Sequence, residues 1–89
     1  MVSNYTVSKA INKGYSILKT TENPRLEAEI ILSHLLNVPR TWLIAHPDAL
    51  VEKETQHKYR GVLNLRRKGN PLPYLLGRWE FFGLSFLVD

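Results

Sequence analysis

The chain has 89 residues and no cysteine, with 44% hydrophobic and 22% charged residues and a formal net charge of +4. This length gives one small domain at most, because so short a chain buries only about 60% of its unfolded surface on folding. The composition excludes a disulfide scaffold, thiolate catalysis, a Cys-ligated metal site and a largely disordered chain. No apolar run reaches the roughly 20 residues that span a bilayer and no signal peptide opens the sequence, so we expect a cytoplasmic protein without membrane contact.

The first predicted helix starts at Thr6-Val7 and ends near Lys19-Thr20. Its buried stripe consists of residues at the i, i+3/i+4, i+7 spacing: Val7, Ala10, Ile11, Gly14 or Tyr15, and Leu18.

A second helix is expected from Pro24 to about Leu36. Asn23 can accept hydrogen bonds from the free amides of the first turn, and proline at the first helical position loses no hydrogen bond. Its wide apolar set, which includes Leu26, Ile30 and Ile31, suits a central helix. Asn37 can adopt the left-handed conformation that closes it.

A short third helix is predicted to begin at Val38-Pro39, to carry Trp42, Leu43 and Ile44, and to break at 46–48. We interpret Trp42 as an anchor between this helix and its neighbours.

The fourth predicted helix spans about 51–68 and ends at Gly69. Its inner face holds Tyr59, Val62, Leu63 and Arg66.

The segment 70–77 repeats the cap-and-proline start, with Asn70-Pro71 opening a short fifth helix that Gly77 ends. Tyr74 is expected in the core there, although an exposed stacking role is the alternative.

After Gly77 the aromatic run, interrupted by Gly83, predicts a β-hairpin over 78–89. The prediction is therefore an all-α fold: a compact bundle of about five helices, two of them short, at 1–77, with a hairpin linker at 78–89 that ends at a domain boundary.

Basic residues gather in the second half of the chain, with no acidic residue between Lys58 and Trp79. The run includes Arg66, Arg67, Lys68 and Arg78, which we take as candidate contacts to a partner or another domain. A solvated helix face, with cations favoured at the helix C-terminus, is the structural alternative.

Catalytic and metal patterns are missing from the sequence. The histidines show no H-E-x-x-H or i, i+4 pair, and neither a P-loop nor a G-x-G-x-x-G occurs. Glu27 and Glu29 are interpreted as scattered surface acids. Glu80, between aromatic residues, is expected to pair with Arg78 or a backbone amide and so to lock the hairpin.

Two motifs together carry a family resemblance. The first is RLEAEIILSHLL at 25–36, and the second is RRKGNPLPYLLGRWEFFGLSF at 66–86. The residues that define the second motif are Gly69, Pro71, Tyr74, Gly77, Glu80, Phe81, Phe82 and Gly83. The chain closely resembles the N-terminal part of the release factor glutamine methyltransferases (the HemK/PrmC family). One departure is Val51 at the expected cap of the fourth helix, for which Asp48 is a substitute.

The resemblance implies a larger enzyme of translation termination that uses S-adenosylmethionine to methylate the glutamine of the G-G-Q motif in peptide-chain release factors. In that family a helical domain and a hairpin linker precede a Rossmann-like methyltransferase domain. The family's N-P-P-Y and glycine-rich cofactor motifs do not occur here, so no catalytic, cofactor-binding or metal residue is carried over. The segment alone is expected neither to bind the cofactor nor to methylate.

Three functions are weighed for this segment. Positioning of the release factor ranks first, because a rigid module can orient a protein substrate toward a distant cofactor. A structural cap on the methyltransferase domain ranks second. A nucleic-acid-binding module that uses Arg66, Arg67, Lys68 and Arg78 ranks last.

Overall fold

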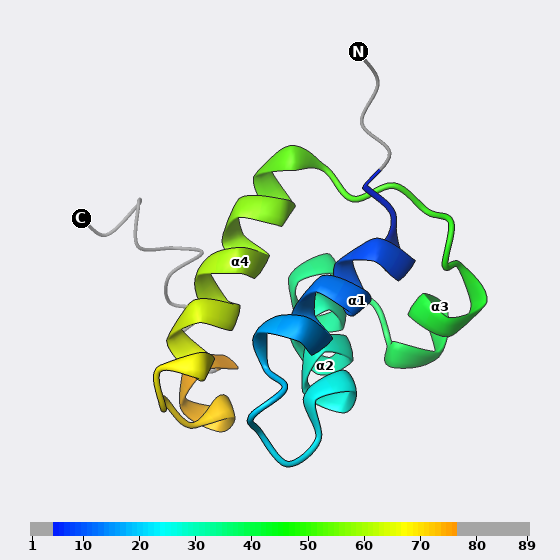
Figure 1. Ribbon diagram of the computed structural model, residues 1–89. Helices are drawn as coiled ribbons and strands as arrows, with labels where there is room; N and C mark the ends of the chain where they lie inside the picture. The colour runs from blue at the N-terminus through cyan, green and yellow to red at the C-terminus, as the bar shows by residue number, and fades with distance from the viewer. Residues whose placement is uncertain (1–4, 77–89) are drawn as a thin grey trace.

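The structure is a computed structural model that describes residues 5–76. Four helices, α1 (Val7–Ile17), α2 (Pro24–Leu36), α3 (Arg40–Ala45) and α4 (Lys53–Arg67), precede a helical turn over 72–76 (Figure 1). Within 5–76 the β pairing is limited to one isolated antiparallel bridge between Thr6 and Leu50. The expected helical bundle with two short helices is thus confirmed for this part of the chain.

Part of the prediction falls outside the described residues. The proposed hairpin at 78–89 lies there, as do the motif residues Gly77, Glu80, Phe81, Phe82 and Gly83.

The chemistry expected at helix ends is largely confirmed. Asn37 ends α2 in the left-handed conformation (φ 59°), and Gly69 follows α4 with φ 111°. Asn23 and Pro24 occupy the predicted cap and first helical positions of α2, but the Asn23 side chain makes no cap hydrogen bond. At α1 the Thr6 hydroxyl accepts a 3.2 Å hydrogen bond from the backbone N–H of Lys9.

Three helix boundaries differ from the sequence prediction. Helix α1 ends at Ile17, α3 begins at Arg40, and α4 begins at Lys53. Neither Val51 nor Asp48 caps α4, because Glu52 takes that position. The reason is tertiary: the segment before α4 runs extended beside the N-terminal segment.

Backbone hydrogen bonds join these segments, and two of them flank the bridge between Thr6 and Leu50. The N–H of Val51 donates to the carbonyl of Tyr5 at 2.8 Å, and the N–H of Val7 donates to that of Ala49 at 2.9 Å. Val51 is consequently buried in the core rather than placed at a helix cap.

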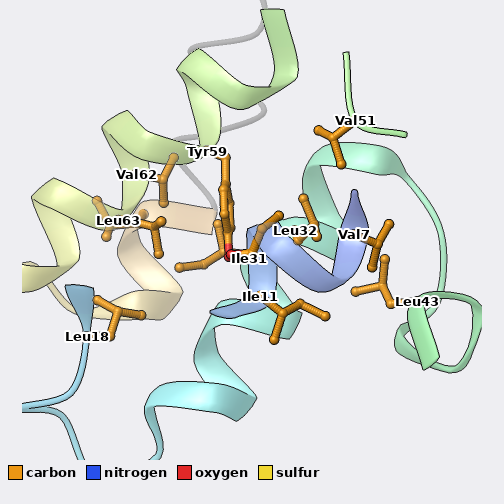
Figure 2. Packing of buried hydrophobic residues seen from close by; sticks show 12 residues of the cluster. Val7, Ile11, Leu18, Ile31, Leu32, Leu43, Val51, Tyr59, Val62 and Leu63 are labelled. Atoms are coloured by element: carbon orange, nitrogen blue, oxygen red, sulfur yellow. The ribbon is translucent and has the colours of Figure 1, made fainter. Parts of the chain in front are cut away.

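The core lies where α2 packs against α1, α3 and α4, and α4 also contacts α1. Helix α2 is central, as its wide apolar set predicts. Figure 2 shows Tyr59 between the side chains of α4 and those of α1 and α2. The buried cluster is Val7, Ala10, Ile11, Leu18, Ile31, Leu32, Leu43, Val51, Tyr59, Val62, Leu63 and Leu75.

Some apolar residues expected inside are on the surface. Tyr74 is 52% exposed and Tyr15 is 50% exposed, so Gly14, and not Tyr15, completes the buried stripe of α1. Ile44 is 64% exposed, because the short α3 turns only Leu43 fully into the core. Leu26, at the first turn of α2, is 37% exposed, whereas Ile31 and Leu32 are fully buried.

Candidate functional site

Arg66 belongs to a polar clamp at the C-terminal end of α4. Its Nε donates to Glu27 Oε1 at 2.8 Å and its Nη2 donates to Glu27 Oε2 at 3.3 Å. Its Nη1 also donates to the backbone carbonyl of Asn70 at 3.2 Å. The hydrogen bond with Glu27 raises the pKa of the Arg66 guanidinium. One guanidinium therefore joins α2, α4 and the turn that leads to 72–76.

The neighbouring cations have a different position. Arg67 and Lys68 are exposed, and neither takes part in the ion pairs found within 5–76. Arg78 lies outside the described residues. The sequence run thus divides into one cation with an internal partner and two that face solvent.

Glu29 forms a second polar cluster, between α2 and α3. Its carboxylate Oε1 accepts hydrogen bonds from Arg40 Nε at 3.2 Å and Nη2 at 3.0 Å, and Oε2 lies 3.6 Å from Arg25 Nε. Glu29 is only 8% exposed. The interpretation of Glu27 and Glu29 as scattered surface acids is therefore wrong, because each holds an arginine of another helix. Of the pairs that Glu27 and Glu29 make, Arg25–Glu29 alone has the local i, i+4 spacing that a sequence shows.

The three histidines lie on different segments of the chain, and His46 makes a defined contact. His46 stacks on Trp42 with ring centroids 4.3 Å apart, and its Nδ1 lies 2.9 Å from the Trp42 carbonyl oxygen. Trp42 itself packs half-buried against the core, which agrees with its predicted role as an anchor. Residues 5–76 contain no group of three His, Cys, Asp or Glu side chains that is able to hold a metal ion.

Several residues near the end of α4, and just after it in the chain, have exposed side chains. Leu65 and Tyr74 are partly exposed there, in addition to Arg67 and Lys68. Asn70 fixes the turn, since its N–H and its Nδ2 both donate to the Leu65 carbonyl, at 3.2 and 2.9 Å. This region offers charge and aromatic surface for contact with another macromolecule.

The helices described above correspond to a known domain. A family model described as the PrmC N-terminal domain matches residues 9–77. The chain belongs to this family. The match covers α2, α3, α4 and most of α1. The resemblance seen in the two sequence motifs is thereby confirmed.

Individual relatives of this PrmC N-terminal domain carry matching names. It is 40% identical over 86 residues to a release factor glutamine methyltransferase of Buchnera aphidicola, covering 97% of this chain and 30% of the relative. It is 38% identical over 69 residues to the release factor glutamine methyltransferase of Vibrio cholerae, covering 78% of this chain and 24% of the relative. A bifunctional methyltransferase of Rickettsia bellii is 34% identical over 87 residues, with coverage of 96% and 16%.

The chain therefore spans less than a third of the length of these curated relatives. No solved structure matches it. Within the part of the PrmC N-terminal domain that the structure describes, no helix combines the length and apolar character needed to cross a membrane.

Proposed function

We propose that this chain positions the protein substrate of a release factor glutamine methyltransferase. The observation that carries the proposal is the family match over residues 9–77, together with relatives named as release factor glutamine methyltransferases. A substrate-positioning domain has to be rigid and has to present surface that the fold itself leaves uncovered. The buried cluster of α1, α2 and α4 provides rigidity, and the exposed cations at the end of α4 provide charged surface.

Binding at such a surface acts on catalysis through orientation. Holding a macromolecular substrate in the productive geometry lowers the entropic part of the activation barrier without any chemical group at the contact. The family resemblance implies that S-adenosylmethionine supplies the methyl group and that the acceptor is the glutamine of the G-G-Q motif. Both would meet in the methyltransferase domain of the longer enzyme, while this domain would hold the body of the release factor.

The decisive experiment compares the whole enzyme with a form that lacks residues 1–76. Both are assayed on an intact release factor and on a short peptide that contains the G-G-Q motif. Positioning predicts a fall in kcat/KM of about ten-fold or more on the intact protein, with the value for the peptide unchanged. Equal loss on both substrates would contradict it.

The same pair of enzymes tests the structural-cap alternative. A cap predicts unchanged kcat/KM on the intact release factor and a lower melting temperature. Calorimetry of the 89-residue chain with S-adenosylmethionine adds an independent check, since the proposal expects no heat of binding.

A further inference from the structure

Gly61 lacks the structural reason that the other glycines within 5–76 have. At Gly14 an added Cβ would meet the Tyr59 hydroxyl and would lie 2.6 Å from Ala28 Cβ, and Gly69 has a positive φ of 111°. Gly61 lies in the interior of α4, and nothing lies within 4 Å of a Cβ built there. Glycine inside a helix costs about 0.5–1 kcal/mol relative to alanine. The fold of the described chain therefore does not explain Gly61.

The side chains around Gly61 form one exposed face of α4. Tyr59, Val62 and Leu63 point into the core, so the opposite side of the helix faces solvent. We call this side the Gly61 face: Lys53, Glu54, His57, Arg60, Gly61, Asn64, Arg67 and Lys68, of which only Asn64 is half-buried. Its one carboxylate, that of Glu54, lies 3.7 Å from Lys58 Nζ. Lys53, Arg60 and Arg67 follow one another at two-turn intervals, about 10 Å apart along the axis.

The cations of this face differ from the other basic residues of α2, α3 and α4. Arg25, Arg40, Lys58 and Arg66 each lie within 4.0 Å of a glutamate. None of the ion pairs found within 5–76 includes Lys53, Arg60, Arg67 or Lys68. The charge of Glu54 is balanced by Lys58, whereas the four cations Lys53, Arg60, Arg67 and Lys68 lie outside these ion pairs. Such a face produces a local positive potential, which attracts an acidic partner.

We infer that the Gly61 face of α4 is a docking surface for an acidic segment of a partner protein, whose backbone crosses α4 at Gly61. A missing Cβ lets the main chain of another protein approach the helix closely. A nucleic acid would not need this close approach, because long Arg and Lys side chains reach its phosphates from a distance. On a partner helix, carboxylates two turns apart would match the interval between Lys53, Arg60 and Arg67. A second copy of this chain is a poor occupant, because its own net charge is +4.

This inference rests on the proposed function for the identity of the partner, since the acidic segment is expected to belong to the release factor. The test uses fluorescence anisotropy with the 89-residue chain and three labelled probes: release factor, poly-L-glutamate and a 20-nucleotide oligouridylate. The variants are Gly61→Leu, which adds bulk in open space, and Arg60→Glu/Arg67→Glu. The controls are Ser16→Leu and Lys19→Glu, which make the same kinds of change at exposed positions outside α4. Circular dichroism verifies that every variant is folded.

Both α4 variants are expected to weaken release factor binding by about ten-fold or more, and both controls to change it by less than about two-fold. If Gly61→Leu binds release factor as tightly as the original chain, the docking surface is refuted while the proposed function stands. If the original chain does not bind release factor, the proposed function fails, and the docking surface is then tested with poly-L-glutamate alone. Weaker binding of poly-L-glutamate by both α4 variants supports the docking surface. Equal binding by the variants, or no binding by the original chain, overturns it. Oligouridylate binding that falls with charge reversal but not with Gly61→Leu assigns the face to nucleic acid and also overturns the inference.

Discussion

The hydroxyl of Tyr59 donates a 2.7 Å hydrogen bond to the backbone carbonyl of Ala10, a residue 49 positions earlier in the chain. This contact ties α4 to α1 inside the core, where Tyr59 is only 1% exposed. Burial raises the pKa of the Tyr59 hydroxyl far above its ordinary value, so the group stays neutral and remains a donor.

Replacement of Tyr59 with phenylalanine keeps the ring but removes the donor to Ala10. The Ala10 carbonyl keeps its hydrogen bond within α1, so Tyr59→Phe loses one buried hydrogen bond and should lower the free energy of unfolding by about 0.5–1.5 kcal/mol. Urea denaturation followed by circular dichroism measures it. Tyr15→Phe, at a half-exposed position, serves as the control and is expected to change stability by less than about 0.5 kcal/mol. A loss as small for Tyr59 as for Tyr15 would contradict the role given to the hydrogen bond.

The raised pKa of Tyr59 also predicts how stability depends on alkaline pH. Below the unfolded pKa of about 10, the hydroxyl is neutral in both states and its contribution is complete. Above that pH the unfolded chain loses the proton while the folded chain keeps it, so stability falls by up to about 1.4 kcal/mol per pH unit. The raised pKa of Tyr5, caused mainly by burial, acts in the same direction.

Urea titrations between about pH 9 and pH 11 test this expectation. The lysine contributions are common to the original chain and to Tyr59→Phe, so the difference between the two slopes isolates Tyr59. Parallel curves for the two proteins would show that Tyr59 ionises equally easily in the folded state.

Two glycines on different helices should respond oppositely to alanine. Gly14→Ala forces a methyl group against the Tyr59 hydroxyl and Ala28, and is expected to cost about 1–3 kcal/mol. Gly61→Ala places the same methyl group in open space on α4 and should stabilise by about 0.5–1 kcal/mol. Thermal melts of the two variants measured together provide the comparison. A loss of stability in Gly61→Ala would mean that Gly61 has a role within the fold.

The two adjacent arginines at the end of α4 are expected to contribute differently to the free energy of unfolding. Arg66→Ala leaves the Glu27 carboxylate and the Asn70 carbonyl without their donor, and should cost about 1–3 kcal/mol. Arg67→Ala removes an exposed side chain and should change stability by less than about 0.5 kcal/mol. Glu27→Gln should reproduce part of the Arg66 effect. Equal losses for the two arginines, measured by urea denaturation, would rule out the clamp.

The candidate surface was only partly predictable from the sequence. A run of basic residues is visible in one dimension, but whether each cation is used inside the fold depends on where distant acids lie. Glu27 and Glu29 belong to α2, and nothing local indicates that they pair with Arg66 of α4 and Arg40 of α3. Once these pairs are known, the exposed cations group by helix face instead of by sequence neighbourhood. Lys53, Arg60 and Arg67 then stand together.

The sequence by itself determined the helices and the family. Period, asparagine, proline and glycine are local signals, and they placed α2, the left-handed Asn37 and the stop at Gly69 correctly. Only the tertiary structure decided which side chains are buried and which are exposed, where α4 begins and why Gly14 is needed. Those features depend on contacts between segments that are far apart in the chain. The Tyr59 hydroxyl of α4 donates to Ala10 of α1, and the Val51 N–H donates to the Tyr5 carbonyl. Such contacts reflect the packing of all the helices together, which no single stretch of sequence encodes.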